Sequence, residues 1–177
     1  MTIKELLTEI LGDLGNHKNF FRTFFYKYSF NPSFRLLLNY RIGKYFNSSK
    51  YKIFKLIAIR YSIVQLKKRN CQISYNTQIG RNVKFAHPLG IVIGSGVVIK
   101  DNVKIWQQVT FGSHGKADMD KLYPVIEKNV KIYSGAKIIG KVRIGENAII
   151  GANAVVLIDV PDNSIAVGIP AKIINKS

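Results

Sequence analysis

Cysteine and acidic residues are both scarce in this chain of 177 residues. The single cysteine, Cys71, excludes a disulfide framework within one chain and is typical of a reducing compartment. No run of eighteen apolar residues occurs, so we predict no transmembrane helix. The N-terminus has no signal-peptide pattern. These absences predict a cytoplasmic protein. The chain holds only 10 Asp and Glu against 27 Lys and Arg, a formal charge of +17.

A six-residue repeat organises the chain after residue 70. A large apolar residue recurs at every sixth position, and a small or aliphatic residue usually follows four places later. Such a period predicts a parallel β-helix, in which each hexad makes a strand and a turn, and stacked coils supply a core that no single coil has. The repeated positions are Ile73, Ile79, Phe85, Ile93, Ile99, Ile105, Phe111, Ile126, Ile132, Ile138, Ile144, Ile150 and Val156.

Two insertions interrupt the repeat. One adds two residues at His87, between Ala86 and Pro88, and the other adds nine residues within loop 112–125. A register slip turns a side chain outward and is common beside active sites, so His87 is a candidate catalytic residue. The loop contains glycines, a lysine and polar residues, as is typical of a loop beside a ligand. The predicted register stacks four residues in one column, with Trp106 beside it: His87, Gln107, Ser134 and Ala152.

Residues 1–70 differ in composition from residues 71–177, and we predict a domain boundary between them. The first 70 residues hold 14 Lys and Arg, three acids and 14 of the 20 aromatic residues. Helical periodicity predicts one helix around Leu6–Ile10, a second that begins at Asn31-Pro32, and a third over 51–68. In the third helix we expect these residues on the apolar side: Ile53, Phe54, Ile57, Val64 and Leu66.

The basic N-terminal segment has two interpretations. In the first, it is a helical bundle that packs on the β-helix and has a solvated basic face. In the second, it is a surface that makes peripheral contact with the anionic inner face of the membrane. Nucleic-acid binding is disfavoured because no recognition motif accompanies the charges.

Three segments resemble the serine acetyltransferases of the hexapeptide-repeat acyltransferase superfamily. They are His87–Gly94 (HPLGIVIG), Gln107–Gly112 (QQVTFG) and Val167–Lys172 (VGIPAK), within a match that covers about residues 70–174. The resemblance implies a left-handed β-helix, a homotrimer and acetyl-coenzyme A bound between neighbouring subunits. It implies no metal, and a metal-dependent hydratase on this fold would need three histidines, whereas the repeat region has only His87 and His114.

The resemblance also assigns roles to individual residues. The catalytic histidine corresponds to His87, which would act as the general base on an acceptor hydroxyl. Residues expected to bind the coenzyme are Gly112, Ser113, Lys116, Ser134, Gly140, Ala152 and Lys172. By their charge, Lys116, Lys137 and Lys172 are the expected partners of its phosphates. Residues expected to bind the acceptor are Trp106, Gln107, His114 and Tyr123.

The sequence departs from serine acetyltransferases where those enzymes hold an amino acid. They have acids at the positions of Ala86 and Gln72, the latter orienting the histidine, and Arg-His-Pro where this chain has residues 122–124 (LYP). Without those charges a free amino acid loses its partners. A backbone carbonyl or Asn76 is the candidate to orient His87 instead.

These departures favour an O-acetyltransferase acting on a sugar hydroxyl of a surface polysaccharide, such as a capsule, O-antigen or exopolysaccharide. Three alternatives stay open: a serine O-acetyltransferase of cysteine biosynthesis, an amino-sugar N-acetyltransferase, and a binding protein with a degenerate site.

Overall fold

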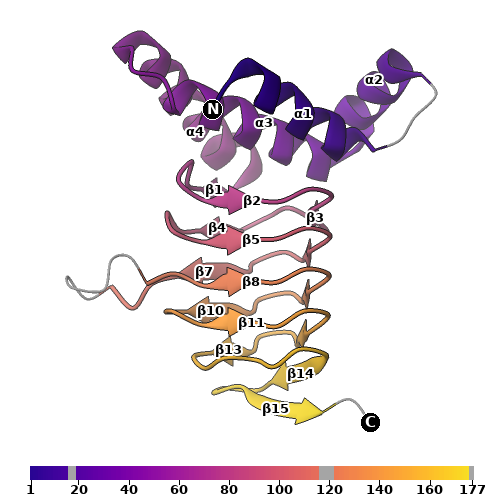
Figure 1. The fold of residues 1–177 in the computed structure, drawn as a ribbon, viewed down its shortest axis with the longest axis vertical. Coiled ribbons are helices and arrows are strands. Elements are labelled where there is room, and N and C mark those ends of the chain that lie inside the picture. Colours follow the sequence, from indigo (N-terminus) through magenta and orange to yellow (C-terminus); the bar gives the residue numbers. More distant parts are fainter. Residues whose placement is uncertain (16–18, 116–121, 176–177) are drawn as a thin grey trace.

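The computed structural model describes residues 1–15, 19–115 and 122–175. Four helices lie across one end of a tall stack of short strands (Figure 1). Among the described residues, no helix has the length and apolarity needed to cross a membrane.

The first three helices begin at residues that satisfy the free N–H groups of a first turn. Thr2 and Glu5 form a capping box, and the side chains of Asn19 and Asn31 each accept a backbone N–H bond. Pro32 occupies the first turn after Asn31, so the predicted helix start is confirmed. The helices are α1 (Ile3–Leu14), α2 (Phe20–Phe30), α3 (Pro32–Asn47) and α4 (Lys52–Arg69).

Helix α4 buries a different face from the one predicted. Ala58 and Gln65 are its buried residues, whereas Ile53 and Leu66 are 62% and 57% exposed. The hydroxyl of Tyr75 donates to the Ala58 carbonyl at 3.1 Å, and Gln65 bonds the first strand of the β-helix. These polar contacts select the inner face, so the prediction for Ile53 and Leu66 is wrong.

The strands form three sheets along the faces of a triangular prism (Figure 1). Sheet A comprises β1 (Gln72–Ile73), β4 (Val92–Ile93), β7 (Thr110–Gly112), β10 (Lys137–Ile139) and β13 (Val155–Val156). Sheet B comprises β2 (Gln78–Ile79), β5 (Val98–Ile99), β8 (Val125–Ile126) and β11 (Arg143–Ile144). Sheet C comprises β3 (Lys84–Phe85), β6 (Lys104–Ile105), β9 (Lys131–Ile132), β12 (Ile149–Ile150), β14 (Ser164–Val167) and β15 (Lys172–Asn175).

The prism winds as a left-handed parallel β-helix, as predicted. In Figure 1 the front strands β2, β5 and β8 point right and the sheet A strands behind them point left while the chain descends. All strand pairs described are parallel except β14 with β15, which form an antiparallel ladder at the C-terminal end. All thirteen repeated apolar residues are at most 6% exposed, which confirms that they point inward.

Asparagines turn the corner between sheets B and C. One residue in each coil has a φ between 54° and 62° there, a left-handed conformation that asparagine tolerates better than most residues. Side-chain amides link some coils, as where Asn82 Nδ2 donates to Asn102 Oδ1 at 2.9 Å. The five residues are Asn82, Asn102, Asn129, Asn147 and Asn163.

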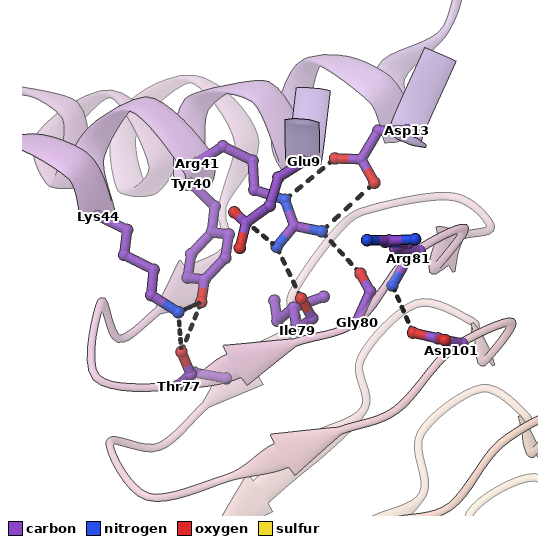
Figure 2. A network of polar contacts seen from close by, with 10 residues as sticks. All are labelled: Glu9, Asp13, Tyr40, Arg41, Lys44, Thr77, Ile79, Gly80, Arg81 and Asp101. Carbon is purple, nitrogen blue, oxygen red and sulfur yellow. Dashed lines mark hydrogen bonds and ion pairs between the residues drawn. The ribbon is translucent and has the colours of Figure 1, made fainter. Parts of the chain in front are cut away.

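Helix α3 covers the open end of sheet B, where β2 is the terminal strand. The Tyr40 hydroxyl and the Lys44 ammonium both donate to the Thr77 carbonyl, at 2.6 and 3.0 Å (Figure 2). The Arg41 guanidinium donates to the carbonyls of Ile79 and Gly80, both at 2.7 Å. The backbone carbonyls of Thr77, Ile79 and Gly80, which have no further strand to pair with, therefore have side-chain hydrogen-bond partners.

Two carboxylates of α1 neutralise Arg41, which is only 1% exposed. Asp13 accepts from its Nε at 3.0 Å, and Glu9 lies 3.2 Å from its other arm. Burial raises the pKa of Asp13 more than the facing guanidinium lowers it. Although burial acts to lower the pKa of Arg41, the Asp13 and Glu9 carboxylates hold that pKa above its ordinary value. The group thus joins α1, α3 and β2.

The terminal strands of the other two sheets are covered by single side chains. The Phe85 N–H of β3 donates to Ser33 Oγ at 2.8 Å, and the Ile73 N–H of β1 donates to Gln65 Oε1 at 3.0 Å. All three open strand edges therefore bond the helices.

Replacing Arg41 tests this cap. We expect Arg41→Met to lower the free energy of unfolding by about 3–5 kcal/mol, because two carboxylates and two carbonyls would lose a buried cation. Urea denaturation followed by circular dichroism measures the change. Arg81→Met, an exposed arginine at the same end, should change stability by less than about 0.5 kcal/mol. Equal effects of the two substitutions would contradict the role of Arg41.

Candidate functional site at two corners of the prism

A two-residue bulge carries His87 at the corner between sheets C and A, which we call the C–A corner. Strand β3 pairs with β6 at an offset of 20 residues (Lys84 with Lys104), whereas β4 pairs with β7 at 18 (Val92 with Thr110). The backbone of His87 has a φ of +54°, an uncommon left-handed conformation for a residue other than glycine.

His87 does not stack on Gln107 as predicted. The Gln108 N–H donates to the Leu89 carbonyl at 2.8 Å, so Leu89 occupies the position above Gln107 and His87 belongs to the bulge. The prediction placed the two extra residues after His87, whereas His87 is itself one of them. The repeat gives the length of an insertion, but it does not show at which residue the regular strand pairing begins again.

The His87 side chain is exposed, and among the described residues none is hydrogen-bonded to it. Asn76 lies between β1 and β2 at a different corner, and it lines a groove with Tyr75 and Gln78. Asn76 therefore does not reach His87 within one chain, and its role in orienting the histidine stays a prediction. Gln72 is exposed on β1 and is paired through its backbone with Val92.

The lower part of the predicted column is confirmed. The Gly135 N–H donates to the Gln107 carbonyl at 3.0 Å and the Asn153 N–H donates to the Ser134 carbonyl at 2.8 Å. Gln107, Ser134 and Ala152 therefore follow one another along the C–A corner.

Trp106 lies beside this column in a stack that the sequence did not reveal. Its ring is 4.5 Å from the Tyr133 ring, and the Lys104 ammonium lies 4.5 Å from the Trp106 ring centroid. Gln107 Oε1 is shielded from solvent and has no hydrogen-bond partner among the described residues. A buried amide oxygen without a partner is rare and marks a position that a ligand could satisfy.

A second group of predicted residues lies at the corner between sheets A and B, the A–B corner. Gly140 N–H donates to the Gly112 carbonyl at 2.8 Å, and Ser113 and His114 follow β7 there. A Cβ on Gly140 would overlap the His114 ring, so the glycine makes room for it. The Tyr123 ring packs against Gly94 and Gly96 in the same way.

The three predicted lysine partners of the coenzyme have different surroundings. Lys116 lies outside the described residues. Lys137 donates to the Gln108 carbonyl at 2.8 Å and to Thr110 Oγ1 at 3.1 Å, so it already has partners. Lys172 is exposed at the start of β15, near the C-terminal end of the prism.

One chain therefore does not bring the predicted site residues together. His87, Trp106, Gln107, Ser134 and Ala152 lie along the C–A corner, whereas Gly112, Ser113, His114, Tyr123 and Gly140 lie along the A–B corner. In Figure 1 the chain leaves β7 and returns to β8 at the left of the prism, away from the sheet C strands at the right.

Comparison with known proteins agrees with this architecture. A family model described as bacterial transferase hexapeptide (six repeats) matches residues 123–157. The soybean serine acetyltransferase complexed with serine superposes with a TM-score of 0.81 and 30% identity, covering 97% of this chain and 70% of the soybean chain. The chain belongs to the serine acetyltransferase branch of the hexapeptide-repeat acyltransferases.

Two further members extend the comparison. A serine acetyltransferase from Buchnera aphidicola (subsp. Schizaphis graminum) is 37% identical over 144 residues, which are 81% of this chain and 54% of that protein. A Brucella abortus serine acetyltransferase in complex with coenzyme A superposes with a TM-score of 0.80 and 26% identity, covering 99% of this chain and 70% of the other. The chain thus spans about half the length of the curated relative.

These findings overturn the predicted polysaccharide acceptor. The relatives named above are serine acetyltransferases, and the soybean structure superposes on 97% of this chain, so the similarity extends through the helices as well as the repeats. The prediction relied on a few charge losses, at Ala86, Gln72 and residues 122–124, and these are outweighed by the similarity of the whole chain.

Proposed function

We propose that the protein transfers an acetyl group from acetyl-CoA to the hydroxyl of serine. The similarity to the soybean enzyme complexed with serine, across 97% of this chain, is the observation that carries the proposal. The relative solved with coenzyme A supports the donor, and the exposed histidine in a strained bulge supports the chemistry.

In this proposal His87 acts as the general base. Its imidazole takes the proton of the serine hydroxyl as the oxygen attacks the thioester carbon. The new C–O bond forms, the C–S bond breaks, and the proton passes to the coenzyme sulfur. A backbone N–H of Gly112 or Ser113, or Trp106 Nε1, would donate to the developing oxyanion. An exposed imidazole without an internal partner is free to bond the acceptor.

Gln107 is our candidate to bind the serine ammonium. Its Oε1 is a buried acceptor without a partner, and it lies on the same corner as His87. This hydrogen-bond acceptor would partly replace the acidic side chain that serine acetyltransferases have at the position of Ala86. His114 and Tyr123 would approach the acceptor from the A–B corner, and the coenzyme would lie against the residues Gly112, Ser113, Lys116, Ser134, Gly140, Ala152 and Lys172.

Two substitutions at His87 test the mechanism. We expect His87→Ala and His87→Asn to lower serine-dependent release of coenzyme A by roughly 100-fold or more, because neither residue is a base. Asparagine tolerates the left-handed backbone, so His87→Asn separates loss of the base from strain in the bulge. Melting temperatures close to wild type confirm that both variants fold.

The wild-type protein provides the test of the acceptor. Serine should release free thiol from acetyl-CoA, with O-acetylserine found by mass spectrometry. Turnover with an amino sugar and none with serine would contradict the proposed function.

We further propose that the active protein is a homotrimer. A complete site needs the C–A corner of one chain and the A–B corner of another, because one chain holds them at separate corners. Joining unlike corners is a heterologous contact, and three such contacts close a ring.

Mixed assemblies test the shared site. Light scattering should give a mass of three 20.0 kDa chains. His87→Ala and Gly140→Trp should each be inactive alone, the second because tryptophan fills the space of the His114 ring. After the two variants are unfolded and refolded together, about one quarter of sites should combine both intact corners and recover activity. No recovery from trimers that contain both variants would contradict the shared site.

We also propose that the helical end contacts an anionic membrane. Along α4, an outer stripe of aliphatic residues at helical spacing is 45–61% exposed: Leu56, Ile59, Ile63 and Leu66. Lys52, Lys55, Arg60 and Lys67 flank the stripe. On α2, Phe21 and Phe30 are 72% and 73% exposed.

Charge favours a bilayer over a second copy of the chain as the partner of this surface. No Asp or Glu occurs between residues 14 and 100, so α2, α3 and α4 carry only positive charge. Pairing two such faces would bring like charges together, whereas an anionic bilayer offers opposite charge and an apolar interior.

Liposome co-sedimentation tests this contact. We expect binding to vesicles that contain anionic phosphatidylglycerol, with weaker binding at high salt and to purely zwitterionic vesicles. Leu56→Asp should weaken binding, whereas Leu157→Asp, the same change at an exposed β-helix residue, should not. Equal, negligible sedimentation in every condition would contradict the proposal.

A further inference from the structure

A groove between α3 and α4 contains three arginines and no acid. It has a volume of about 350 Å³, and Tyr28 of α2 contributes to its wall. Arg35 lies near the start of α3 and Arg69 at the end of α4, while Arg60 lies two to three turns earlier in α4. No ion pair joins these arginines to a carboxylate among the described residues.

Two of these guanidinium groups are partly removed from water without compensation. The Nε atoms of Arg35 and Arg69 are shielded from solvent, and neither has a hydrogen-bond partner within the described ranges. Burial, and after it the charge of Arg35, lowers the pKa of Arg69. Holding two like charges together in a partly desolvated groove is unfavourable unless an anion joins them.

Asn39 provides a second, independent sign of a missing ligand. It lines the same groove, is only 7% exposed, and its Oδ1 has no partner among the described residues. Oxygen and nitrogen of an amide are assigned from hydrogen bonds, so the group can present either an acceptor or donors. Together with the Nε atoms of Arg35 and Arg69, its Oδ1 forms a set of shielded polar atoms that have no hydrogen-bond partner among the described residues.

Among the residues that the structure describes, no carboxylate lines the groove to serve as that partner. Of the three acids before residue 14, Glu9 and Asp13 bind Arg41, and Glu5 caps α1. The next acid in the sequence is Asp101, which accepts the Arg81 N–H on the β-helix. Within the described part of the chain, no carboxylate is therefore available to this groove, so we look for an anionic ligand.

The remaining walls of the groove indicate the class of ligand. Leu38, Ile42 and Val64 make one part apolar, and Tyr61 adds an aromatic ring. Planar guanidinium forks match the oxygens of phosphate and bind them through paired hydrogen bonds. We propose that this groove binds a phosphate group, held by Arg35 and Arg69, with any apolar part of the same ligand along Leu38, Ile42 and Val64.

The phosphate has two possible sources, a free phosphate compound or the headgroup of an anionic lipid. The site lies at the helical end, apart from both corners that hold the predicted acetyltransfer residues. The proposal is therefore independent of the acetyl transfer proposed above.

Isothermal titration calorimetry at constant ionic strength tests the site with two probes. Inorganic phosphate and soluble dihexanoyl phosphatidic acid are each titrated into the full chain. Saturable binding of inorganic phosphate indicates a free phosphate compound, and binding of the phosphatidic acid alone indicates a lipid headgroup. Either result supports the site, and saturable binding of neither probe overturns it.

Three variants show whether the groove is responsible. Arg35→Gln and Arg69→Gln should each weaken binding of the effective probe roughly tenfold or more, because each removes a charged hydrogen bond. Lys4→Gln makes the same charge change on an exposed part of α1 outside the groove and should alter affinity less than about twofold. Equal weakening in all three variants would mean diffuse charge attraction and would overturn the proposal.

Stability without ligand provides a further readout. If Arg69 exists to bind phosphate, removing its unpaired charge should leave the melting temperature of Arg69→Gln unchanged or higher, and should abolish the rise that the bound probe causes in wild type. A purely structural arginine would instead lower the melting temperature on substitution, with probe binding unaffected, and that result would overturn the proposal.

Discussion

The structure depends on covering the open strand edges at the N-terminal end of the β-helix. A stack of parallel coils ends in unpaired backbone groups that would otherwise recruit another strand. Here a buried arginine, a tyrosine and a lysine of α3 meet the edge of β2, and Gln65 and Ser33 meet the other two edges. A cap made of polar side chains fixes the helices in register with the first coil, which an apolar contact alone would not do.

The cap also determines the charge of the surface around it. Arg41 is buried, so it requires carboxylates, and α1 supplies Glu9 and Asp13. These are two of the three acids before residue 100, and among the described residues no other cation of α2, α3 or α4 forms an ion pair. The basic exterior and the buried ion pair are therefore two results of one distribution of acids along the chain.

Much of the fold was predictable because its period is encoded in single residues. Each inward position is apolar, and a slip of one residue would expose the whole set, so the hexads fixed the coils from Ile73 to Val156. The inner face of α4 was not predictable, since Ala58 and Gln65 are selected by hydrogen bonds to distant residues. The antiparallel pairing of β14 with β15 was not predicted, because the six-residue repeat ends before these strands.

The site was predictable in part. Counting along the repeat aligned Gln107, Ser134 and Ala152 correctly. The nine-residue insertion between Gln107 and Ser134 lies at the other corner, so it does not disturb this column. The same counting misplaced His87, because the two extra residues lie beside it and the backbone bonds of Leu89 decide where the ladder resumes. The acetyl acceptor was mispredicted because the prediction gave most weight to a few missing charges. Gln107 was among the residues predicted to bind the acceptor, but that its Oε1 is shielded from solvent and has no partner among the described residues depends on packing that the sequence does not show.

The stacked corner that runs down from His87 has a fixed scale. Neighbouring coils are separated by the spacing of hydrogen-bonded strands, about 4.8 Å. Gln107, Ser134, Ala152 and then Gly168 follow at successive levels below the bulge. The bulge and the last coil are thus separated by about 20 Å along a straight, rigid line. The length of an extended molecule that fits this corner would therefore depend on the number of coils. Adding or removing one coil would change that length by one coil spacing, and the groups at either end would stay the same.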